Sequence, residues 1–472
     1  MQGTPADLTI AGLIIAAVSI SLSTFVTGHA LLHIRRPQAA FGWIAISWVF
    51  PFGGSALYFL FGINRIRNDT LFRSSTPQPP LDPSSWPIQE VPGLEPLSRL
   101  GLAVTGCPLV AGNQVDVLHN GEEAFPAMLE AIDTATDRVY LSTYIFQGKA
   151  YDGAFVSYLE RAANRGVTVC VLLDGIGELY TWPRTRRLIR SPNIRIGRFL
   201  PPRLFPPSIH ANLRNHRKIL IADQIAFAGG MNISQRHVIT ECTNGRSVVD
   251  VHFRLTGPIV TYLEKTFIKD WAFATGRKLK LTDAPHDHAG SALCRMVTDG
   301  PDDGLDQITA LVAGAVSVAK KKVSVMSPYF LPTPELLGAF QTAALRGVEV
   351  CVVLPERNNL GYVHRATRHA LAELLERDVR VVYQPAPFVH SKLLIVDDAY
   401  VQLGSANMDP RSLRLNFELL VEVYDSGLAA RLASHFSEIE SRSRVLTLHE
   451  LANRPLPTKL LDGVAWLFSP YL

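Results

Sequence analysis

The stretch HRKILIAD at residues 216–223 and the stretch HSKLLIVD at residues 390–397 decide the fold. Each begins with histidine, has lysine two positions later, continues through four apolar residues and ends in aspartate. Apolar residues are sufficient for a buried strand, and neither histidine nor lysine is needed for its packing. Because the pattern recurs 174 positions along the chain, we interpret it as a duplicated functional motif.

The sequence around the two motifs is duplicated as well. ERAANRGVTVCVLLDG at 160–175 resembles QTAALRGVEVCVVLPE at 341–356, and each reads as a helix end, a glycine turn and a buried strand. Strands and helices alternate in this way through each half, which predicts an α/β fold. We expect two similar domains, residues 98–285 and 286–456, that pack about a pseudo-twofold axis.

Two long apolar runs precede the duplicated part. No Asp, Glu, Lys or Arg occurs from Leu8 to Leu32 or from Pro37 to Asn64, and each run exceeds the roughly 20 residues that cross a bilayer. A signal peptide fits poorly, because no basic residue precedes the first run and a second run follows it. A buried helical hairpin is another alternative. We predict a two-span membrane anchor at residues 1–68, with both chain ends on one side of the membrane.

Charge alone does not orient this anchor. Arginines flank the second run on both sides, at Arg35 and Arg36 and again at Arg65, Arg67 and Arg73, so the positive-inside rule does not choose a face. The five cysteines favour the cytoplasm, because they are scattered and lack the CxxC spacing of a zinc site or the pairing of a disulfide framework.

The remaining segments outside the duplication are a linker and a tail. Residues 69–97 read as an extended linker, because seven prolines occur between Pro77 and Pro96. Residues 457–472 contain apolar and aromatic side chains that suit an interfacial helix. The formal net charge of +4 is too small to identify a partner.

Strand geometry indicates which motif side chains act together. Residues two apart share one face of a strand, so the histidine and lysine of each motif point the same way. Asp223 and Asp397 come seven positions after each histidine, on the opposite face of a regular strand, and suit a structural or turn-capping role. We interpret five other histidines as ordinary structural side chains: His29, His119, His237, His364 and His369.

A glycine turn with an asparagine follows each motif, GGMN at 229–232 and GSAN at 404–407. Glycine lets the backbone approach a ligand closely, and the amides of Asn232 and Asn407 are hydrogen-bond donors. Each repeat therefore supplies an imidazole, an ammonium group and an amide. Brought together across a twofold interface, these groups suit a phosphate diester.

HxKxxxxD followed by GSxN or the similar GGMN, once in each repeat, resembles the phospholipase D superfamily. The two apolar runs, LRNHRKILIAD, GPD (300–302), SPYFLP and NMDPRS (407–412) are similar, more narrowly, to bacterial cardiolipin synthases. The resemblance covers nearly the whole chain and implies two phospholipase D-type domains, each a mixed sheet flanked by helices. Gly230 departs from the general pattern, because it stands where Ser405 supplies a hydroxyl in the second repeat.

The resemblance also implies roles for the motif residues. His216 is expected to attack phosphorus and form a phosphohistidine, and His390 to act as acid and base; the residues alone leave this choice even. The catalytic residues expected from the family are His216, Lys218, Asp223, His390, Lys392 and Asp397. The expected substrate-binding residues are Arg214, Gly230, Asn232, Ser405 and Asn407.

A nucleophilic histidine also needs an acceptor for its second ring nitrogen. Strand parity excludes the motif aspartates from this role. Asp250 and Glu418 begin the two downstream strands at 250–257 and 418–425, and we predict that they orient the histidines. The alternative is that both are solvated carboxylates at strand starts. No metal-ligand cluster is visible in the sequence, and the chemistry requires neither a metal nor a cofactor.

The substrate is inferred from an arginine-rich gap. No acidic residue occurs between Glu178 and Asp223, and this indicates a surface for anions, either nucleic acid or anionic lipid. The gap contains Arg184, Arg186, Arg187, Arg190, Arg195, Arg198, Arg203, Arg214, Arg217 and Lys218. Interleaved aliphatic residues suit acyl chains, and the apolar runs favour lipid over nucleic acid.

We therefore predict a cardiolipin synthase that converts two phosphatidylglycerol molecules into cardiolipin and glycerol. Its partners are anionic phospholipids and the bacterial inner membrane, with the protein multi-pass and its catalytic domains on the cytoplasmic face; the oligomeric state stays open. The alternatives are a membrane-anchored hydrolytic phospholipase D, a transferase that uses another alcohol, and a membrane-tethered nucleic-acid-binding or scaffold protein.

Overall fold

The structure, a computed structural model, describes residues 5–34, 37–62, 91–202, 213–241, 246–282, 287–300 and 306–469. The chain forms two compact units, Met1–Pro77 and Gln78–Leu472. Most of the predicted linker lies outside the described residues, as do Arg203, Cys242 and the last three residues of the tail.

The first unit is a group of helices. It comprises α1 (Pro5–His33), α2 (Pro37–Val49), α3 (Pro51–Leu57) and a π-helical turn, η1 (Tyr58–Gly62). In the described residues, one helix segment, Ile10–His33, is long and apolar enough to cross a membrane. The second apolar run is not one continuous helix. It breaks at Phe50, because Pro51 lacks the backbone N–H that would continue α2.

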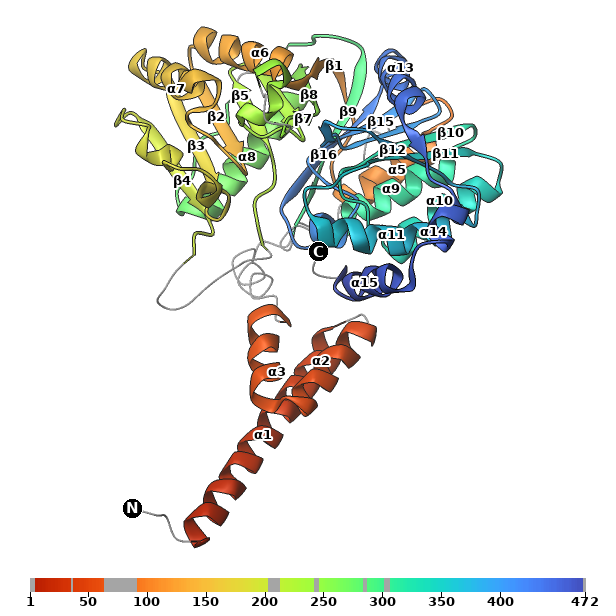
Figure 1. The fold of residues 1–472 in the computed structure, drawn as a ribbon. Coiled ribbons are helices and arrows are strands. Elements are labelled where there is room, and N and C mark those ends of the chain that lie inside the picture. The colour runs from red at the N-terminus through yellow and green to blue at the C-terminus, as the bar shows by residue number, and fades with distance from the viewer. Residues whose placement is uncertain are drawn as a thin grey trace. The chain divides into compact units, whose positions relative to one another are not determined.

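The second unit contains two copies of one arrangement (Figure 1). In the first copy the strands are β1 (Val110–His119), β2 (Arg138–Thr143), β3 (Thr168–Asp174), β4 (Ile194–Phe199), β5 (Ile219–Ala222), β6 (Ile225–Gly229), β7 (Val248–Val249) and β8 (Val251–Thr256). Its helices are α6 (Asn120–Thr134), α7 (Ala154–Asn164) and α8 (Ile259–Thr275).

The second copy repeats this order with more helix. Its strands are β9 (Ala292–Asp299), β10 (Lys322–Met326), β11 (Glu349–Pro355), β12 (Arg380–Gln384), β13 (Phe388–Val389), β14 (Leu393–Val396), β15 (Tyr400–Gly404), β16 (Glu418–Tyr424) and β17 (Arg444–Val445). Its helices are α9 (Gln307–Val318), α10 (Pro334–Leu345), α11 (Gly361–Leu375), α12 (Pro410–Arg414), α13 (Ser426–Arg442), α14 (Leu448–Ala452) and α15 (Leu456–Leu467).

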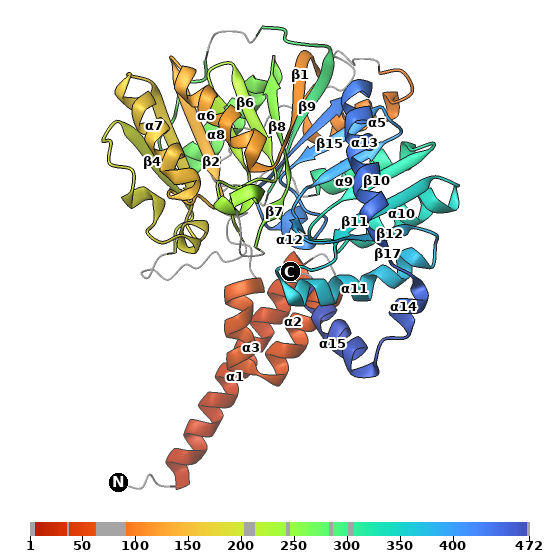
Figure 2. The same ribbon diagram turned by 45° about the horizontal axis from the view of Figure 1, so that its top comes forward.

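Apart from β7 and β13, which pair with each other, the strands of the two copies join into one mixed sheet. The order is β17-β12-β11-β10-β14-β15-β16-β9-β1-β8-β6-β5-β2-β3-β4, so the copies are mirrored about the antiparallel pair β1 and β9. Apart from β17, each strand has its counterpart at the same distance from that pair. The structure thereby confirms the α/β fold with two similar halves. Figure 2 shows the halves side by side.

Helices cover both faces of the sheet. Leu263 of α8 and Leu432 of α13 belong to one continuous apolar core that runs under both halves, together with Cys170 and Cys351. Both cysteine side chains have no exposed surface, as expected for small apolar residues at equivalent positions. The opposite face is covered by α6 and α7 in the first copy and by α9 and α10 in the second.

The helix that precedes the first copy in sequence packs against the second copy. Helix α5 (Glu95–Thr105) precedes the first copy, yet Leu97 packs into the core of the second copy with Ile308 of α9. Arg295 of β9 donates to the carbonyl oxygen of Ser98 at 2.8 Å. The predicted boundary at residue 98 divides this helix between the linker and the first domain, whereas the structure places it on the second.

Candidate active site

Backbone pairing between the two copies positions each motif histidine. The amide of His216 donates to the carbonyl oxygen of Phe417 at 3.0 Å, where Asn215 and Phe417 form an isolated bridge. In the other half, β13 pairs in parallel with β7, and the amide of His390 donates to the carbonyl oxygen of Val249 at 2.8 Å. In both cases the residue after the acceptor is a carboxylate.

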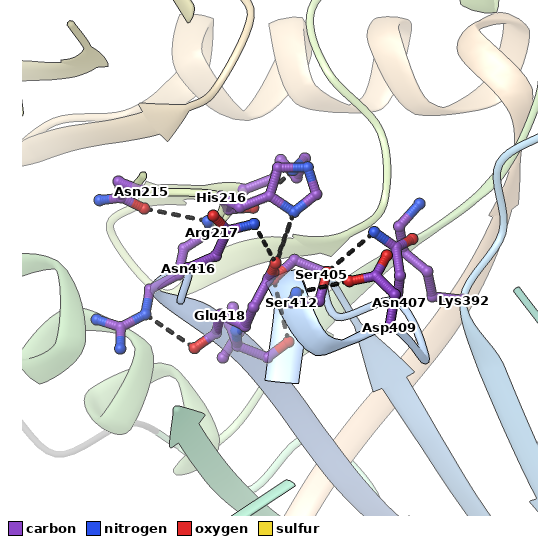
Figure 3. A network of polar contacts seen from close by, with 12 residues as sticks. Asn215, His216, Arg217, Lys392, Ser405, Asn407, Asp409, Ser412, Asn416 and Glu418 are labelled. Carbon is purple, nitrogen blue, oxygen red and sulfur yellow. Dashed lines mark hydrogen bonds and ion pairs between the residues drawn. The ribbon is translucent and has the colours of Figure 1, made fainter. Parts of the chain in front are cut away.

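Each carboxylate is hydrogen-bonded to the histidine of the other repeat. His216 Nδ1 lies 2.9 Å from Glu418 Oε1, and His390 Nδ1 lies 2.9 Å from Asp250 Oδ2. Figure 3 shows Glu418 below the His216 ring. An Nδ1–H that donates to a carboxylate leaves the lone pair on Nε2. The contacts expected for Asp250 and Glu418 are therefore present, and they cross between the repeats.

The two carboxylates are held differently. Glu418 accepts hydrogen bonds from the Ser405 hydroxyl and, at 3.2 Å, from Asn416 Nδ2. Ser405 also accepts from the amide of Leu419 at 3.0 Å, so the side chain expected to bind substrate instead positions Glu418. Asp250 Oδ1 accepts from the amide of Val251 at 2.8 Å.

Gly230 is explained by the space around Asp250. A Cβ atom at this position would lie 2.9 Å from Asp250 Oδ2 and 3.1 Å from the carbonyl oxygen of His390. No side chain fits there without moving the carboxylate. Gly230 therefore replaces serine in the half-site where the carboxylate is Asp250, which is shorter than Glu418 and has no hydroxyl partner among the residues that the structure describes.

The motif lysines are almost fully buried beside the histidines. Lys218 Nζ donates to the carbonyl oxygen of His216 at 2.6 Å, and Lys392 Nζ donates to that of His390. Burial lowers the pKa of Lys218 to about 7 and that of Lys392 to about 8, although Glu418 and Asp250 oppose the shift. The charge of Lys392 also lowers the pKa of Lys218. The two lysines are therefore close enough for their charges to interact.

Both histidines are uncharged at neutral pH. Burial lowers the pKa of His216 to about 4, against the opposing effect of Glu418. Burial and the charge of Lys392 lower the pKa of His390 to about 3. The pKa of Asp250 lies below its ordinary value despite burial, because His390 donates to it and the charge of Lys392 is close by. A neutral imidazole beside an ionised carboxylate is the state suited to attack on phosphorus.

The asparagines of the glycine turns are anchored by protein groups. Asn232 Oδ1 accepts from the amide of Ile145 at 3.1 Å, so its NH₂ group is oriented by the first copy. Asn407 Nδ2 donates to Ser412 Oγ at 3.0 Å, which uses one of its two N–H groups. In the described part of the chain, Asn407 Oδ1 is buried without a hydrogen-bond partner.

The motif aspartates lie at the far end of their strands and bind backbone. Asp223 accepts from the amides of Thr136, Asp137 and Arg138 at 2.7–3.1 Å. Asp397 accepts in the same way from the amides of residues 320–322 at 2.6–2.8 Å. Both tie the strand end to the start of a neighbouring strand, in agreement with the turn-capping role and not with the catalytic role that the resemblance implied.

The arginine-rich gap is not a single surface. Arg214, expected to bind substrate, is 1% exposed and pairs with Asp174 at 3.3 Å. Arg217 is buried against Asp270 at 2.5 Å. Some of the positive charge of the gap is therefore buried, because folding pairs these arginines with acidic residues from elsewhere in the sequence. Arg186 and Arg198 likewise converge on Glu178, at 2.6 and 3.1 Å, while Arg187, Arg190 and Arg195 remain exposed.

Two further rings lie beside the histidines. The Tyr144 ring centroid is 5.5 Å from that of His216, and the His237 centroid is 6.2 Å from that of His390. Sequence reasoning treated His237 as an ordinary structural histidine. His237 comes five residues after Asn232, just as Ser412 comes five residues after Asn407 in the second repeat. This equivalent position is the signal that would have placed His237 near the site. Its Nδ1 is buried without a partner among the described residues.

Comparison with known proteins agrees with this geometry. The profile of the family described as "Cardiolipin synthase, PLD-like domain" matches residues 128–271 and 313–440, which include both motifs. A cardiolipin synthase of a Geobacillus species is 30% identical over 484 residues, covering 98% of this chain and 95% of the relative. The major cardiolipin synthase of Bacillus subtilis is 30% identical over 493 residues, covering 96% and 99%.

A solved structure shares the fold. Phosphatidylserine synthase of Haemophilus influenzae superposes with a TM-score of 0.63 at 16% identity, covering 80% of this chain and 100% of that chain. At this identity the likeness concerns the fold and not the substrate.

Proposed function

The chain belongs to the cardiolipin synthase family of the phospholipase D superfamily, and from that premise we propose that it transfers a phosphatidyl group between two phosphatidylglycerol molecules. The products are cardiolipin and glycerol. The observation that supports the use of the two motifs as one site is the crossed pairing of each imidazole with the carboxylate of the other repeat.

In the first step, Nε2 of His216 attacks the phosphorus of the donor lipid. A P–N bond forms, the P–O bond to the glycerol head group breaks, and the departing oxygen takes a proton from Nε2 of His390. Lys218 and Lys392 neutralise the charge on the phosphoryl oxygens. The bound diester is itself an anion, so it raises the pKa of His390 from its low value in the free protein and lets the imidazole carry this proton.

In the second step, the acceptor lipid replaces the glycerol. His390, now neutral, removes a proton from a hydroxyl of the second phosphatidylglycerol, whose oxygen attacks the phosphohistidine. The new P–O bond forms as the P–N bond breaks, and His216 returns to its starting state. One diester is exchanged for another, so the reaction is close to thermoneutral and reversible.

Transfer must outcompete water at the phosphohistidine. An acceptor held and aligned at the intermediate gains an effective concentration that can reach about 10⁵–10⁸ M, far above that of water. A membrane surface provides this acceptor. Exposed Arg187, Arg190 and Arg195 suit anionic head groups, and Trp182, 84% exposed, suits the interface. Helix α15, the predicted interfacial tail, exposes Leu456, Leu460, Val464 and Leu467.

We further propose that the second unit acts on the cytoplasmic face of the bacterial inner membrane. The described cysteines have no disulfide partners, which suits a reducing compartment. Anionic phospholipid is the partner that this site chemistry recognises. The same chemistry needs no metal or cofactor, because two histidines supply the nucleophile and the proton transfers.

Purified protein with phosphatidylglycerol vesicles tests the proposal. The expected products are cardiolipin and glycerol, with phosphatidic acid minor, with activity retained in chelator and cardiolipin consumed when glycerol is added in excess. If phosphatidic acid dominates at high surface density of phosphatidylglycerol, the protein is a hydrolase. If another added alcohol is the preferred acceptor, it is a different phosphatidyltransferase.

A further inference from the structure

We propose that α2 and α3 form a re-entrant hairpin, which enters the bilayer and leaves it on the same face, so that α1 alone crosses the membrane. This inference concerns the first unit and does not depend on the reaction that the second unit catalyses. It replaces the two-span anchor with one span and a half-depth hairpin, and it reverses the side on which the N-terminus lies.

Contacts along α1 show how far the hairpin descends. Helix α1 ends at His33, and α2 runs back beside it until the Ser23 hydroxyl donates to the carbonyl oxygen of Ser47 at 2.6 Å. Trp48 Nε1 donates to Thr27 Oγ1 at 3.1 Å, at nearly the same level. The chain therefore reverses direction beside Ser23, and α2 does not extend along the N-terminal part of α1.

The chain then returns to the level from which α2 began. The Tyr58 hydroxyl and His29 Nδ1 lie 2.6 Å apart, so the end of α3 is next to the last turn of α1. The Tyr58 ring also packs edge-on against Trp43, near the start of α2, with centroids 5.4 Å apart. Figures 1 and 2 show α3 running back alongside α2. Both ends of the hairpin thus lie at one end of α1.

The depth is about half a membrane. Residues 23–33 of α1 correspond to about 15 Å at 1.5 Å per residue, against about 30 Å for the hydrocarbon core. Helix α2 has 13 residues and α3 has 7, so neither is long enough to cross. Helix α1, with a 24-residue apolar segment, is long enough.

Two polar backbone groups at the break have hydrogen-bond partners within the unit, as a membrane requires. In a continuous helix the carbonyl of Ser47 would accept from the amide of residue 51, but Pro51 has none. The Ser23 hydroxyl supplies the missing donor. The amide of Gly54 donates to the carbonyl oxygen of Phe50 at 2.6 Å, which closes the first turn of α3. The carbonyl of Ser47 and the amide of Gly54 are therefore satisfied at the depth where water is absent.

Glycine permits the close contact of the two short helices. A Cβ atom at Gly54 would lie 2.3 Å from the carbonyl oxygen of Ile46, so the backbones could not approach with any larger residue there. Gly42, in the same hairpin, has no atom within 4 Å of an added Cβ. The two positions provide a matched pair for mutagenesis.

The hairpin also resolves the distribution of charge. In a two-span anchor, the arginines before and after the second apolar run would lie on opposite faces, against the positive-inside rule. In a hairpin both sets adjoin one face. Residues 1–9 contain no Lys or Arg. The rule then assigns the arginines and the second unit to the cytoplasm and the N-terminus to the opposite side.

Cysteine accessibility in the full-length protein distinguishes the arrangements. Gln2→Cys, Gln38→Cys and Asn64→Cys are made separately and labelled in intact spheroplasts with a membrane-impermeant maleimide, with and without permeabilisation. Peptide mapping identifies the labelled position, so the natural cysteines do not interfere. The hairpin predicts that position 2 reacts from outside, whereas positions 38 and 64 react only after permeabilisation.

Two other patterns contradict the hairpin, and the inverse pattern contradicts only the side assigned to the N-terminus. If positions 2 and 64 react together and position 38 reacts on the opposite face, the second run crosses the membrane. If all three react on one face, α1 does not cross. As an independent check, Gly54→Leu should reduce the membrane-inserted yield several-fold more than Gly42→Leu. Equal effects of the two leucine variants would contradict the close α2–α3 contact.

Discussion

The His216 half-site and the His390 half-site share one motif but hold their histidines by different means. Glu418, which pairs with His216, receives hydrogen bonds from the Ser405 hydroxyl and from Asn416. Asp250, which pairs with His390, is one methylene shorter and is held by the amide of Val251. The duplication therefore preserved the imidazole–carboxylate contact, while the support behind it diverged.

The surroundings of the two rings differ as well. Tyr144 packs edge-on against His216, whereas His237 lies near His390. One half-site is thus lined by a phenol ring and the other by a third imidazole. Two similar histidines with unlike surroundings are suited to unlike roles, nucleophile and acid–base catalyst, which the sequence alone leaves interchangeable.

Removal of each histidine in turn should have the largest effect on activity. His216→Ala and His390→Ala should each lower turnover of phosphatidylglycerol by about 10³-fold or more, because both steps use both groups. A phosphatidyl ester with a nitrophenol leaving group needs no acid for its departure. With that substrate, His390→Ala should still release a burst of nitrophenol and His216→Ala should not. The reverse pattern would exchange the two roles.

Loss of the carboxylate charges should have the next largest effect. Asp250→Asn and Glu418→Gln keep the shape but remove the acceptor that orients Nδ1–H, and we expect turnover to fall about 10²–10⁴-fold in each. Because the pairing is crossed, Glu418→Gln should abolish the nitrophenol burst with His216, while Asp250→Asn should spare it. Near-normal turnover in both variants, with unchanged circular dichroism, would return them to ordinary strand-start carboxylates.

The pH profile should be set by the buried groups of both half-sites. His216, with a pKa of about 4, keeps its lone pair at pH 5, so kcat/KM should fall only below about pH 5 and not near 6.5. Lys218 and Lys392, with pKa values of about 7 and 8, lose their charge as the pH rises, so kcat/KM should fall above about pH 7–8. Rates constant to pH 10 would contradict the second limb.

Substitution of Ser405 and Gly230, the residues behind the two carboxylates, should change turnover less than loss of the carboxylate charges. Ser405→Gly removes one hydrogen bond to a charged group, and we expect a loss of about tenfold in turnover. Gly230→Ser adds the hydroxyl that the other half-site has, yet it should also lower activity, because its Cβ would crowd Asp250 and the His390 carbonyl oxygen. An increase in activity with Gly230→Ser would show that the half-sites are interchangeable.

The motif aspartates should matter least to the chemistry. Asp223→Asn and Asp397→Asn weaken hydrogen bonds to backbone amides, and we expect a loss of about 1–3 kcal/mol in the free energy of unfolding. Turnover per folded molecule should stay within about twofold. If either variant unfolds normally but loses turnover, the catalytic role implied by the family resemblance holds.

The chemical composition of the site could be predicted from sequence because it depends on local geometry. A strand alternates its faces, so the spacing predicts that histidine and lysine act together without Asp223. In the structure β5 and β14 begin directly after the two lysines, and each pair of side chains still lies together. A duplication at constant spacing shows that the set occurs twice. Asp250 and Glu418 followed from a requirement of the chemistry, an acceptor for Nδ1, together with their position downstream of each motif.

The tertiary structure alone decided which groups meet across the chain. The crossed pairing of His216 with Glu418, the brace from Ser405 and the burial of Arg214 against Asp174 all join segments that sequence spacing does not relate. The same is true of α5, which packs on the half that follows later in the chain. Each depends on long-range packing, where the gain from burial selects one partner among many equally apolar or charged candidates. Local spacing is therefore informative about which side chains share a face, and only the folded chain determines what that face contacts.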